Sequence, residues 1–364
     1  MQHRILIISS EPNYPNIFPG LSIFARDWQE HLENENIKSE VLSFQKIFFL
    51  RYLRIEGFSL NFFSNFRYLS LFPNWSLISG ITSFVKIFIF FFKIRQAKTY
   101  DLIICNNFVW AGFCSIFLYW MHKTKIILVE HNANMIVKNK SFIHQILFAK
   151  TMKINTACKL YCVSKSFKDQ IKKELNIDAN LISNVIPLPL LDGLKYKNNK
   201  FKLISIGSLD NNKDQLFQIK ILQTLPDNYS LTIIGDGPNH EMLKKYIQDQ
   251  RISDRVKLLG ELSRLSVKQH LDSASILLNT SYLETFGVVN IEAGSRGLKI
   301  VSFDNGGVWD STLPINRRVV KTRFLDEWSK DILSIEASKV TAIEISNAYR
   351  AKFGNLKWVI KELA

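Results

Sequence analysis

Residues 281–294 read SYLETFGVVNIEAG, and this stretch joins a short apolar run at 276–278 to a helical pattern at 288–297. Its two carboxylates, Glu284 and Glu292, are eight residues apart on either side of a strand-to-helix turn. In an open α/β sheet, ligands bind at the carboxyl ends of the strands, where such a turn lies. We therefore expect both side chains to face one crevice.

The start of this helical pattern suits an anion. The backbone amides around Phe286, Gly287 and Val288 open the helix, and an uncapped start offers free N–H groups and a partial positive charge. A carboxylate within the helix, such as that of Glu292, can accept two hydrogen bonds from a ribose diol. The pattern indicates a clamp for a nucleotide sugar. The alternative is that both glutamates are ordinary solvated residues.

Outward from this stretch, short β-branched runs alternate with longer amphipathic segments. Nearly continuous apolar strands that alternate with helices predict parallel sheets covered on both faces, an α/β fold. The predicted strands are residues 4–9, 101–105, 125–129, 160–163, 202–206, 231–234, 256–259, 276–278 and 300–303. The predicted helices include residues 166–175, 214–223, 241–251, 266–274, 288–297 and 341–364.

The alternation pauses once, at IPLP over residues 186–189 and a polar stretch over 195–200. We interpret the pause as a linker between two Rossmann-like units. The expected division is an N-terminal domain over 1–190, a C-terminal domain over 191–345, and a final helix over 346–364 that packs back toward the N-terminal domain.

Composition limits the class of protein. The 364 residues are 47% hydrophobic and 22% charged, which excludes collagen, coiled coils and wholesale disorder. A net charge of +15 favours anionic partners such as phosphorylated small molecules, nucleic acids or lipid headgroups. An AT-rich genome is an alternative source of much of the Lys and Phe excess.

Several patterns of other classes do not occur. No GxGxxG follows the first strand and no GxxxxGK[ST] occurs, which argues against nicotinamide, flavin and P-loop chemistry. The four cysteines form no CxxC pair and no zinc set, so we expect reduced thiols, no zinc site and the cytosol. The most apolar stretch, 78–92, contains Lys86 and is shorter than the about 20 residues of a spanning helix.

Four further segments occur in a characteristic order around the Glu-x7-Glu stretch. They are ISIGSL at 204–209 followed by Lys213, LTIIGDGP at 231–238, VKLLG at 256–260 and DNGG at 304–307. With the Glu-x7-Glu stretch, they resemble family 4 of the retaining glycosyltransferases, which have the GT-B fold. The resemblance implies two Rossmann-like domains that face each other across a cleft.

The resemblance also implies roles for the residues of the second half. Lys213 would neutralise the leaving pyrophosphate, Glu292 would bind the ribose hydroxyls, and Glu284 would hold the hydroxyls of the sugar. The amides of Phe286, Gly287 and Val288 are implied to help at the sugar or phosphate.

The N-terminal half matches this family more loosely. The resemblance implies that Gly20 lets the backbone approach the phosphates and that His131 lies against the donor sugar. His131 and Glu284 are thus the expected catalytic residues. The alternatives are an ordinary turn glycine and a structural histidine.

The sequence departs from the family pattern at several positions. Ser208, in the expected donor site, stands where the family usually has Arg, so one pyrophosphate cation is missing. Asp214 replaces the usual Gly after Lys213. Arg264, Lys268 and Arg296 are candidate substitutes for the missing cation.

The resemblance implies a retaining, metal-independent transfer of a hexose or N-acetylhexosamine from a UDP- or GDP-linked sugar, with no cofactor. The expected acceptor is a cell-surface glycan or a lipid-linked precursor of lipopolysaccharide, capsule or exopolysaccharide. Two alternatives stay open: a catalytically degenerate GT-B protein that binds a nucleotide sugar or a partner glycosyltransferase, and a GT-B epimerase.

Residues 46–72 are rich in aromatic residues with interleaved Lys and Arg. This mixture suits the interface of an anionic membrane, where a lipid-linked acceptor would lie. We expect a peripheral protein at the inner face of the cytoplasmic membrane that does not bind nucleic acid. The alternative is a Phe-rich core.

Overall fold

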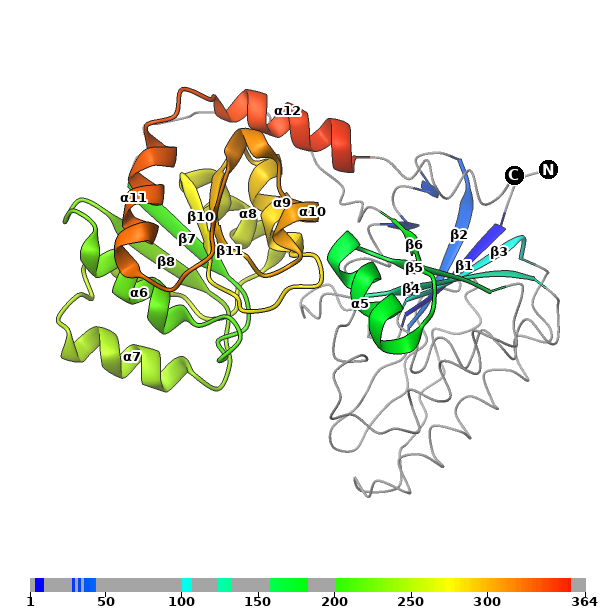
Figure 1. Ribbon diagram of the computed structural model, residues 1–364, viewed down its shortest axis with the longest axis horizontal. Helices are drawn as coiled ribbons and strands as arrows, with labels where there is room; N and C mark the ends of the chain where they lie inside the picture. Colours follow the sequence, from blue (N-terminus) through cyan, green and yellow to red (C-terminus); the bar gives the residue numbers. More distant parts are fainter. Residues whose placement is uncertain are drawn as a thin grey trace, which may run out of the picture. The chain divides into compact units, whose positions relative to one another are not determined.

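The computed structural model describes residues 4–9, 28–29, 32–33, 36–43, 100–106, 124–131, 158–182 and 201–354. The chain forms two compact units, Met1–Pro187 with Asn355–Ala364 and Leu188–Gly354 (Figure 1). The division between residues 187 and 188 falls within the IPLP segment. Each unit contains a parallel sheet, which confirms the predicted α/β class.

The first unit contains a six-stranded parallel sheet in the order β2-β1-β3-β4-β5-β6. Its elements are β1 (Arg4–Ser9), β2 (Lys38–Ser43), β3 (Leu102–Asn106), β4 (Lys125–Glu130), β5 (Cys158–Cys162), α5 (Lys165–Leu175) and β6 (Asn180–Leu181). Every residue of β3 and all but the first of β4 are buried, as expected of central strands covered on both faces. Ser164 caps α5 by accepting a hydrogen bond from Phe167 N at 3.2 Å.

The second unit contains a parallel sheet in the order β12-β11-β10-β7-β8-β9. Its strands are β7 (Lys202–Ile206), β8 (Ser230–Ile234), β9 (Val256–Leu258), β10 (Ile276–Asn279), β11 (Lys299–Phe303) and β12 (Arg317–Val320). The chain winds outward from β7 in one direction and then outward from β10 in the other. The switch point of this doubly wound sheet, where ligands bind, therefore lies between β7 and β10.

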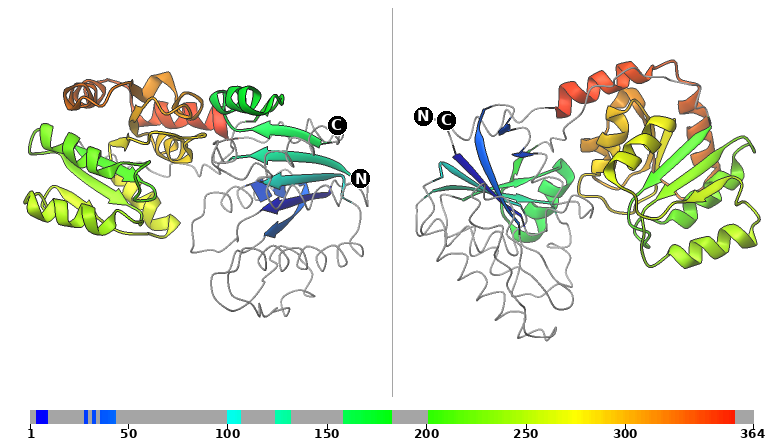
Figure 2. Two further views of the ribbon diagram at one scale, coloured as in Figure 1. Left: turned by 60° about the horizontal axis from the view of Figure 1, so that its bottom comes forward. Right: turned by 180° about the vertical axis from the view of Figure 1, so that it is seen from behind.

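Helices cover both faces of this second sheet (Figure 2). The helices are α6 (Gln215–Thr224), α7 (His240–Asp249), α8 (Arg264–Ser273), α9 (Val288–Ser295), α10 (Val308–Ser311), the 3-10 helix η3 (Pro314–Asn316), α11 (Leu325–Glu336) and α12 (Ala342–Phe353). On one face, α6, α7 and α11 share a buried apolar cluster that includes Trp328. On the other, α8 contacts β7, α9 contacts β11, and α12 packs over α9.

Some elements were not predicted from the sequence. Strands β2, β6 and β12 lie at the edges of their sheets, where polar residues are tolerated, so their sequences lack a continuous apolar run. Helix α11 was also missed. The predicted C-terminal segment 346–364 begins within α12, which contacts α9, and its residues 355–364 lie outside the described part. The packing expected of this segment toward the N-terminal domain therefore stays a prediction.

In the part of the chain that the structure describes, no helix has both the length and the apolar character that a membrane crossing requires. Residues 46–72 and 78–92, which the sequence singled out, lie outside the described residues.

Candidate active site

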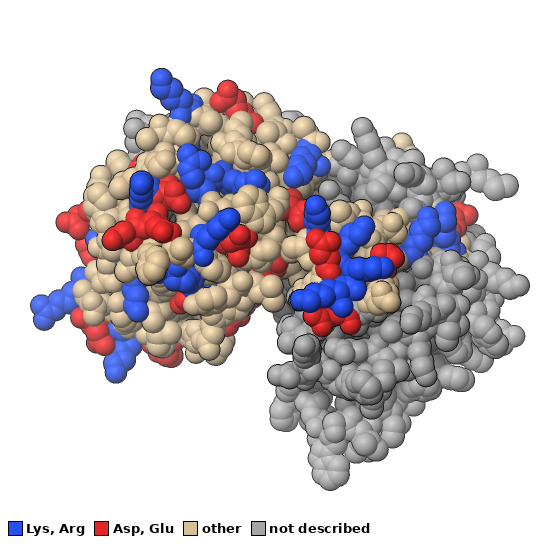
Figure 3. Space-filling view, viewed as in Figure 1, with Lys and Arg blue, Asp and Glu red and all other residues tan. Residues whose placement is uncertain are grey.

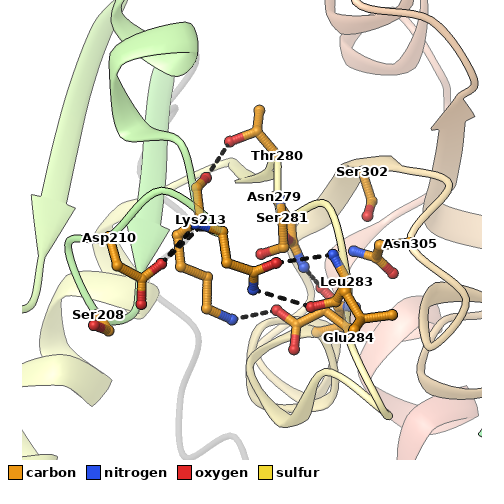
Figure 4. Close-up of polar contacts among 12 residues, drawn as sticks. Ser208, Asp210, Lys213, Asn279, Thr280, Ser281, Leu283, Glu284, Ser302 and Asn305 are labelled. Atoms are coloured by element: carbon orange, nitrogen blue, oxygen red, sulfur yellow. Dashed lines mark hydrogen bonds and ion pairs between the residues drawn. The ribbon is translucent and has the colours of Figure 1, made fainter. Parts of the chain in front are cut away.

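The candidate site forms at the carboxyl ends of β7 and β10, the two neighbouring strands at the switch point. The loop after β7 brings Ser208, Asp210 and Lys213, and the loop after β10 brings Ser281 and Glu284 (Figure 4). These loops are separated by more than sixty residues of sequence and meet only because their strands are paired.

Lys213 and Glu284 meet as an ion pair between the Lys213 Nζ and the Glu284 Oε1. The side chains are only 23% and 13% exposed, so solvent screens their attraction less than at an open surface. The backbone of Glu284 is fixed to the DNGG loop, because its N–H donates to Asn305 O and its carbonyl accepts from Gly307 N, each at 3.0 Å. The structure therefore brings two of the predicted site residues, Lys213 and Glu284, into direct polar contact.

The backbone of Lys213 is held at both ends. Its N–H donates to Asp210 Oδ1 at 3.0 Å, and its carbonyl accepts from Thr280 Oγ1 at 2.7 Å. The Asp210 carboxylate also accepts a hydrogen bond from Asn212 N at 3.0 Å. Aspartate often accepts such local backbone hydrogen bonds in turns. The position of the ammonium group thus depends on both loops.

Asn212 joins the two loops directly. Its side chain donates to Leu283 O and accepts from Leu283 N, both at 3.1 Å, as an amide does in a strand pairing. Its own carbonyl accepts from Tyr282 N at 2.9 Å. The three hydrogen bonds of Asn212 therefore join the two loops beside the ion pair. Neither Asn212 nor Thr280 was singled out from the sequence, since their partners are distant along the chain.

The first turn of α9 follows Gly287, whose φ of 85° lies in the left-handed region that favours glycine. A Cβ at this position would lie 2.8 Å from Asn290 Nδ2, so a side chain would also crowd the turn. No side chain caps α9, and the N–H groups of Gly287 and Val288 donate to no acceptor within the described residues. These amides can therefore receive an anion. The Phe286 side chain is buried against Phe353, so only its backbone is available for that role.

Glu292 lies on α9 and is partly exposed. The helix that carries it is fixed from behind by α12. A Cβ on Gly294 would lie 2.1 Å from the Tyr349 ring, so only glycine permits this close approach of the two helices. Ser346 Oγ donates to Ser295 O at 2.6 Å and adds a polar link. Burial raises the pKa of the Tyr349 hydroxyl, which stays protonated and donates to Asn316 Oδ1.

Ser208, in the place of the expected cation, is exposed, and its carbonyl accepts from Gln215 Nε2 at 2.9 Å. Arg296 binds Asp272 through two nitrogens, one of them at 2.6 Å, so this arrangement commits it to a structural ion pair. The face of the second unit shown in Figure 3 mixes Lys and Arg with Asp and Glu rather than presenting one sign of charge. Within the candidate site, the groups suited to an anion are Lys213 and the amides at the start of α9.

His131 follows β4 in the first unit and is buried. The backbone N–H of His131 donates to Glu130 Oε1 at 3.1 Å. Burial lowers the pKa of its imidazole to about 3, so the ring is neutral at physiological pH and can act as a hydrogen-bonding group rather than a cation. Gly20 lies outside the described residues. The roles expected for these two residues stay predictions.

Two Rossmann-like units, with acidic and basic groups gathered at a switch point, define the GT-B class of fold. Solved structures share it over the whole chain. Sucrose-phosphate synthase from Thermosynechococcus elongatus superposes with a TM-score of 0.76 at 16% identity, covering 100% of this chain and 97% of that one. Anabaena HepE, solved with UDP and glucose, gives 0.66 at 18% identity, covering 100% and 99%.

The second unit also matches a family by sequence. Residues 192–350 match the model of the family described as glycosyl transferases group 1. The GPI3 subunit of phosphatidylinositol N-acetylglucosaminyltransferase from Saccharomyces cerevisiae strain YJM789 is 28% identical over 172 residues, which are 43% of this chain and 38% of GPI3. The O-antigen chain mannosyltransferase RfbU of Salmonella typhimurium is 27% identical over 60% of this chain and 64% of its own length. The chain thus spans under two fifths of the length of GPI3.

Proposed function

We propose that this chain is a retaining, metal-independent glycosyltransferase that moves a hexose or N-acetylhexosamine from a UDP- or GDP-linked donor. One observation carries the proposal. Lys213 and Glu284 form an ion pair at the switch point. Helix α9, which carries Glu292, follows the loop of Glu284, and the Gly287 and Val288 amides at its start have no acceptor within the described residues.

Each group has a step in this reaction. The ammonium of Lys213 neutralises part of the charge of the departing diphosphate, and the amides of Gly287 and Val288 donate hydrogen bonds to it. Glu292 binds the ribose hydroxyls and Glu284 the sugar hydroxyls. The departing phosphate oxygen takes the proton of the acceptor hydroxyl, and the acceptor oxygen bonds the anomeric carbon on the face that the phosphate leaves. The protein then supplies positioning and charge rather than a nucleophile.

The names of the relatives support an envelope glycan or a lipid as the acceptor. Relatives are named for transfer to phosphatidylinositol, for O-antigen chain synthesis and for poly(glycerol-phosphate) glucosylation. We extend this to a cell-surface glycan or lipid-linked acceptor, reached by peripheral contact of residues 46–72 with the inner face of the cytoplasmic membrane. Flotation with anionic vesicles tests this contact: a chain that never floats contradicts it.

The decisive test is a screen of UDP- and GDP-sugars for release of the nucleoside diphosphate by the full chain, with the anomeric configuration of the product read by NMR. We expect release from one donor, unchanged by EDTA and reduced at least about 100-fold in Glu284→Gln. The matched control is Glu261→Gln, at an exposed glutamate of the same unit. Absence of binding and of release with every donor overturns the proposal.

A second candidate is a protein that binds the donor without turnover. The exposed Ser208, in place of an arginine, favours it, because the leaving diphosphate has one cation fewer. Binding of UDP or GDP with no release from any donor–acceptor pair selects this alternative.

A further inference from the structure

Asp214, directly after Lys213, occupies a conformation that glycine adopts more readily. Its φ is 48° and its ψ is 58°, in the left-handed region. Its carboxylate offsets this cost by capping α6, accepting from Phe217 N at 3.2 Å. The backbone therefore tolerates Asp214, where the family pattern has Gly, and the aspartate adds a negative charge beside Lys213.

The partner of this charge is Arg323, 109 residues away in the loop between β12 and α11. Arg323 Nη2 forms an ion pair with Asp214 Oδ2, and Arg323 Nη1 donates to Thr280 O at 2.9 Å. The two side chains are about a quarter exposed. The Arg323 guanidinium thus binds both Asp214, which follows Lys213, and Thr280, whose hydroxyl donates to the Lys213 carbonyl.

Aromatic rings fix the guanidinium in place. Its carbon lies 4.2 Å from the ring centroids of both Phe217 and Tyr282, and 5.1 Å from that of Phe303. Tyr282 OH also donates to Asp214 Oδ2 at 3.3 Å. The planar guanidinium of Arg323 stacks on aromatic rings and donates two hydrogen bonds at the same time, which the ammonium group of lysine cannot do.

We propose that Asp214 and Arg323 are positioning residues that set the backbone of Lys213 so that its ammonium meets the diphosphate of the donor. This inference rests on the proposed function. Neither residue needs to touch the donor, since both act through the segment 213–214 and Thr280.

The test is a double-mutant cycle on the affinity of the full chain for UDP and for GDP, measured by calorimetry. Charged hydrogen bonds of this kind correspond to about tenfold in affinity. We expect Arg323→Gln to weaken binding by about tenfold and to have no further effect in a Lys213→Met background. Asp214→Asn, which keeps the cap and tolerates the left-handed conformation, should weaken binding similarly, and Arg323→Lys should restore little.

The control is Arg255→Gln. Arg255 directly precedes β9, pairs with Asp227 and donates to the carbonyls of Leu222 and Leu225. It therefore lies at the amino end of its strand, whereas the loops of the site follow the carboxyl ends of β7 and β10. It should lower the melting temperature and leave UDP affinity unchanged.

Four results bear on the proposal in different ways. An unchanged affinity in folded Arg323→Gln and Asp214→Asn overturns it, as does an equal loss in the Lys213→Met background, which would indicate general loosening. Should Arg323→Gln fail to fold, Asp214→Asn in both backgrounds completes the cycle. A wild-type chain that binds neither UDP nor GDP overturns the proposed function itself and the inference with it.

Discussion

Lys213 and Glu284 satisfy each other: the cation expected to bind the diphosphate and the carboxylate expected to bind the sugar form one ion pair. In the proposed function a donor must separate them, so part of its binding free energy is spent on this exchange. The pair keeps each charge compensated in a partly buried site, because an isolated charge there is costly.

Glu284→Gln should therefore separate binding from chemistry. Without the carboxylate, Lys213 is released toward the diphosphate, so UDP or GDP affinity should stay equal or rise while transfer falls by at least about 100-fold. Calorimetry and an initial-rate assay measure the two quantities. A parallel loss of affinity and rate would contradict this exchange.

Gly287→Ala should destabilise the second unit by about 2 kcal/mol or more, because it combines a left-handed φ of 85° with a Cβ 2.8 Å from Asn290 Nδ2. Gly260→Ala is the matched control, since its φ of 68° is also left-handed but nothing lies within 4 Å of its Cβ. The control should cost about 1 kcal/mol by urea unfolding. Equal costs would mean that the crowding relaxes freely.

Gly294→Ala should cost about 1–3 kcal/mol because its methyl group would enter the space of the Tyr349 ring. Adding Tyr349→Leu should make the combined loss smaller than the sum of the single losses, whereas Tyr349→Phe, which keeps the ring, should bring no relief. Urea unfolding of the single and double variants measures this coupling. Additive losses would show that α12 does not press on α9 at this point.

The stability of the chain should depend on pH through His131. Its pKa is about 3 when folded and about 6.5 when unfolded, so between these values the unfolded state binds the extra proton. The stability is therefore lost as the pH falls from about 6.5 toward 3, by up to about 1.4 kcal/mol per pH unit. His131→Gln should flatten the pH dependence of urea unfolding in this window, and identical slopes for both proteins would rule out a buried neutral ring.

Gln215 and Gln218 should share an ordered water. Both are buried, their amide nitrogens donate to the carbonyls of Ser208 and Leu278, and within the described residues no donor reaches either Oε1. Both side chains line a small pocket that Lys213 and Glu284 also line, with room for a water molecule. A crystal structure should show density within hydrogen-bonding distance of both oxygens; a dry pocket would contradict this assignment, and a peak with more than four oxygen neighbours would indicate a cation instead.

The sequence predicts the central strands well, because β3, β4, β7, β8 and β10 are mostly apolar and most of their residues are buried. It does not predict edge strands such as β12, whose Arg317 and Arg318 lie where one side meets solvent. In the candidate site, the Glu-x7-Glu spacing and Lys213 could be found because their signals are local. Contacts such as those of Asp214 with Arg323 could not, since nothing in either segment encodes a partner 109 residues away.

The winding order of the second sheet has a consequence for synthesis of the protein. A nascent chain that has emerged only as far as β9 possesses Lys213 but neither its carboxylate partner nor the loop that anchors it, because both follow β10. Long-range pairings of this kind form late in folding. The nucleotide donor of the proposed function would therefore stabilise the finished domain, but it could not guide the early folding intermediates.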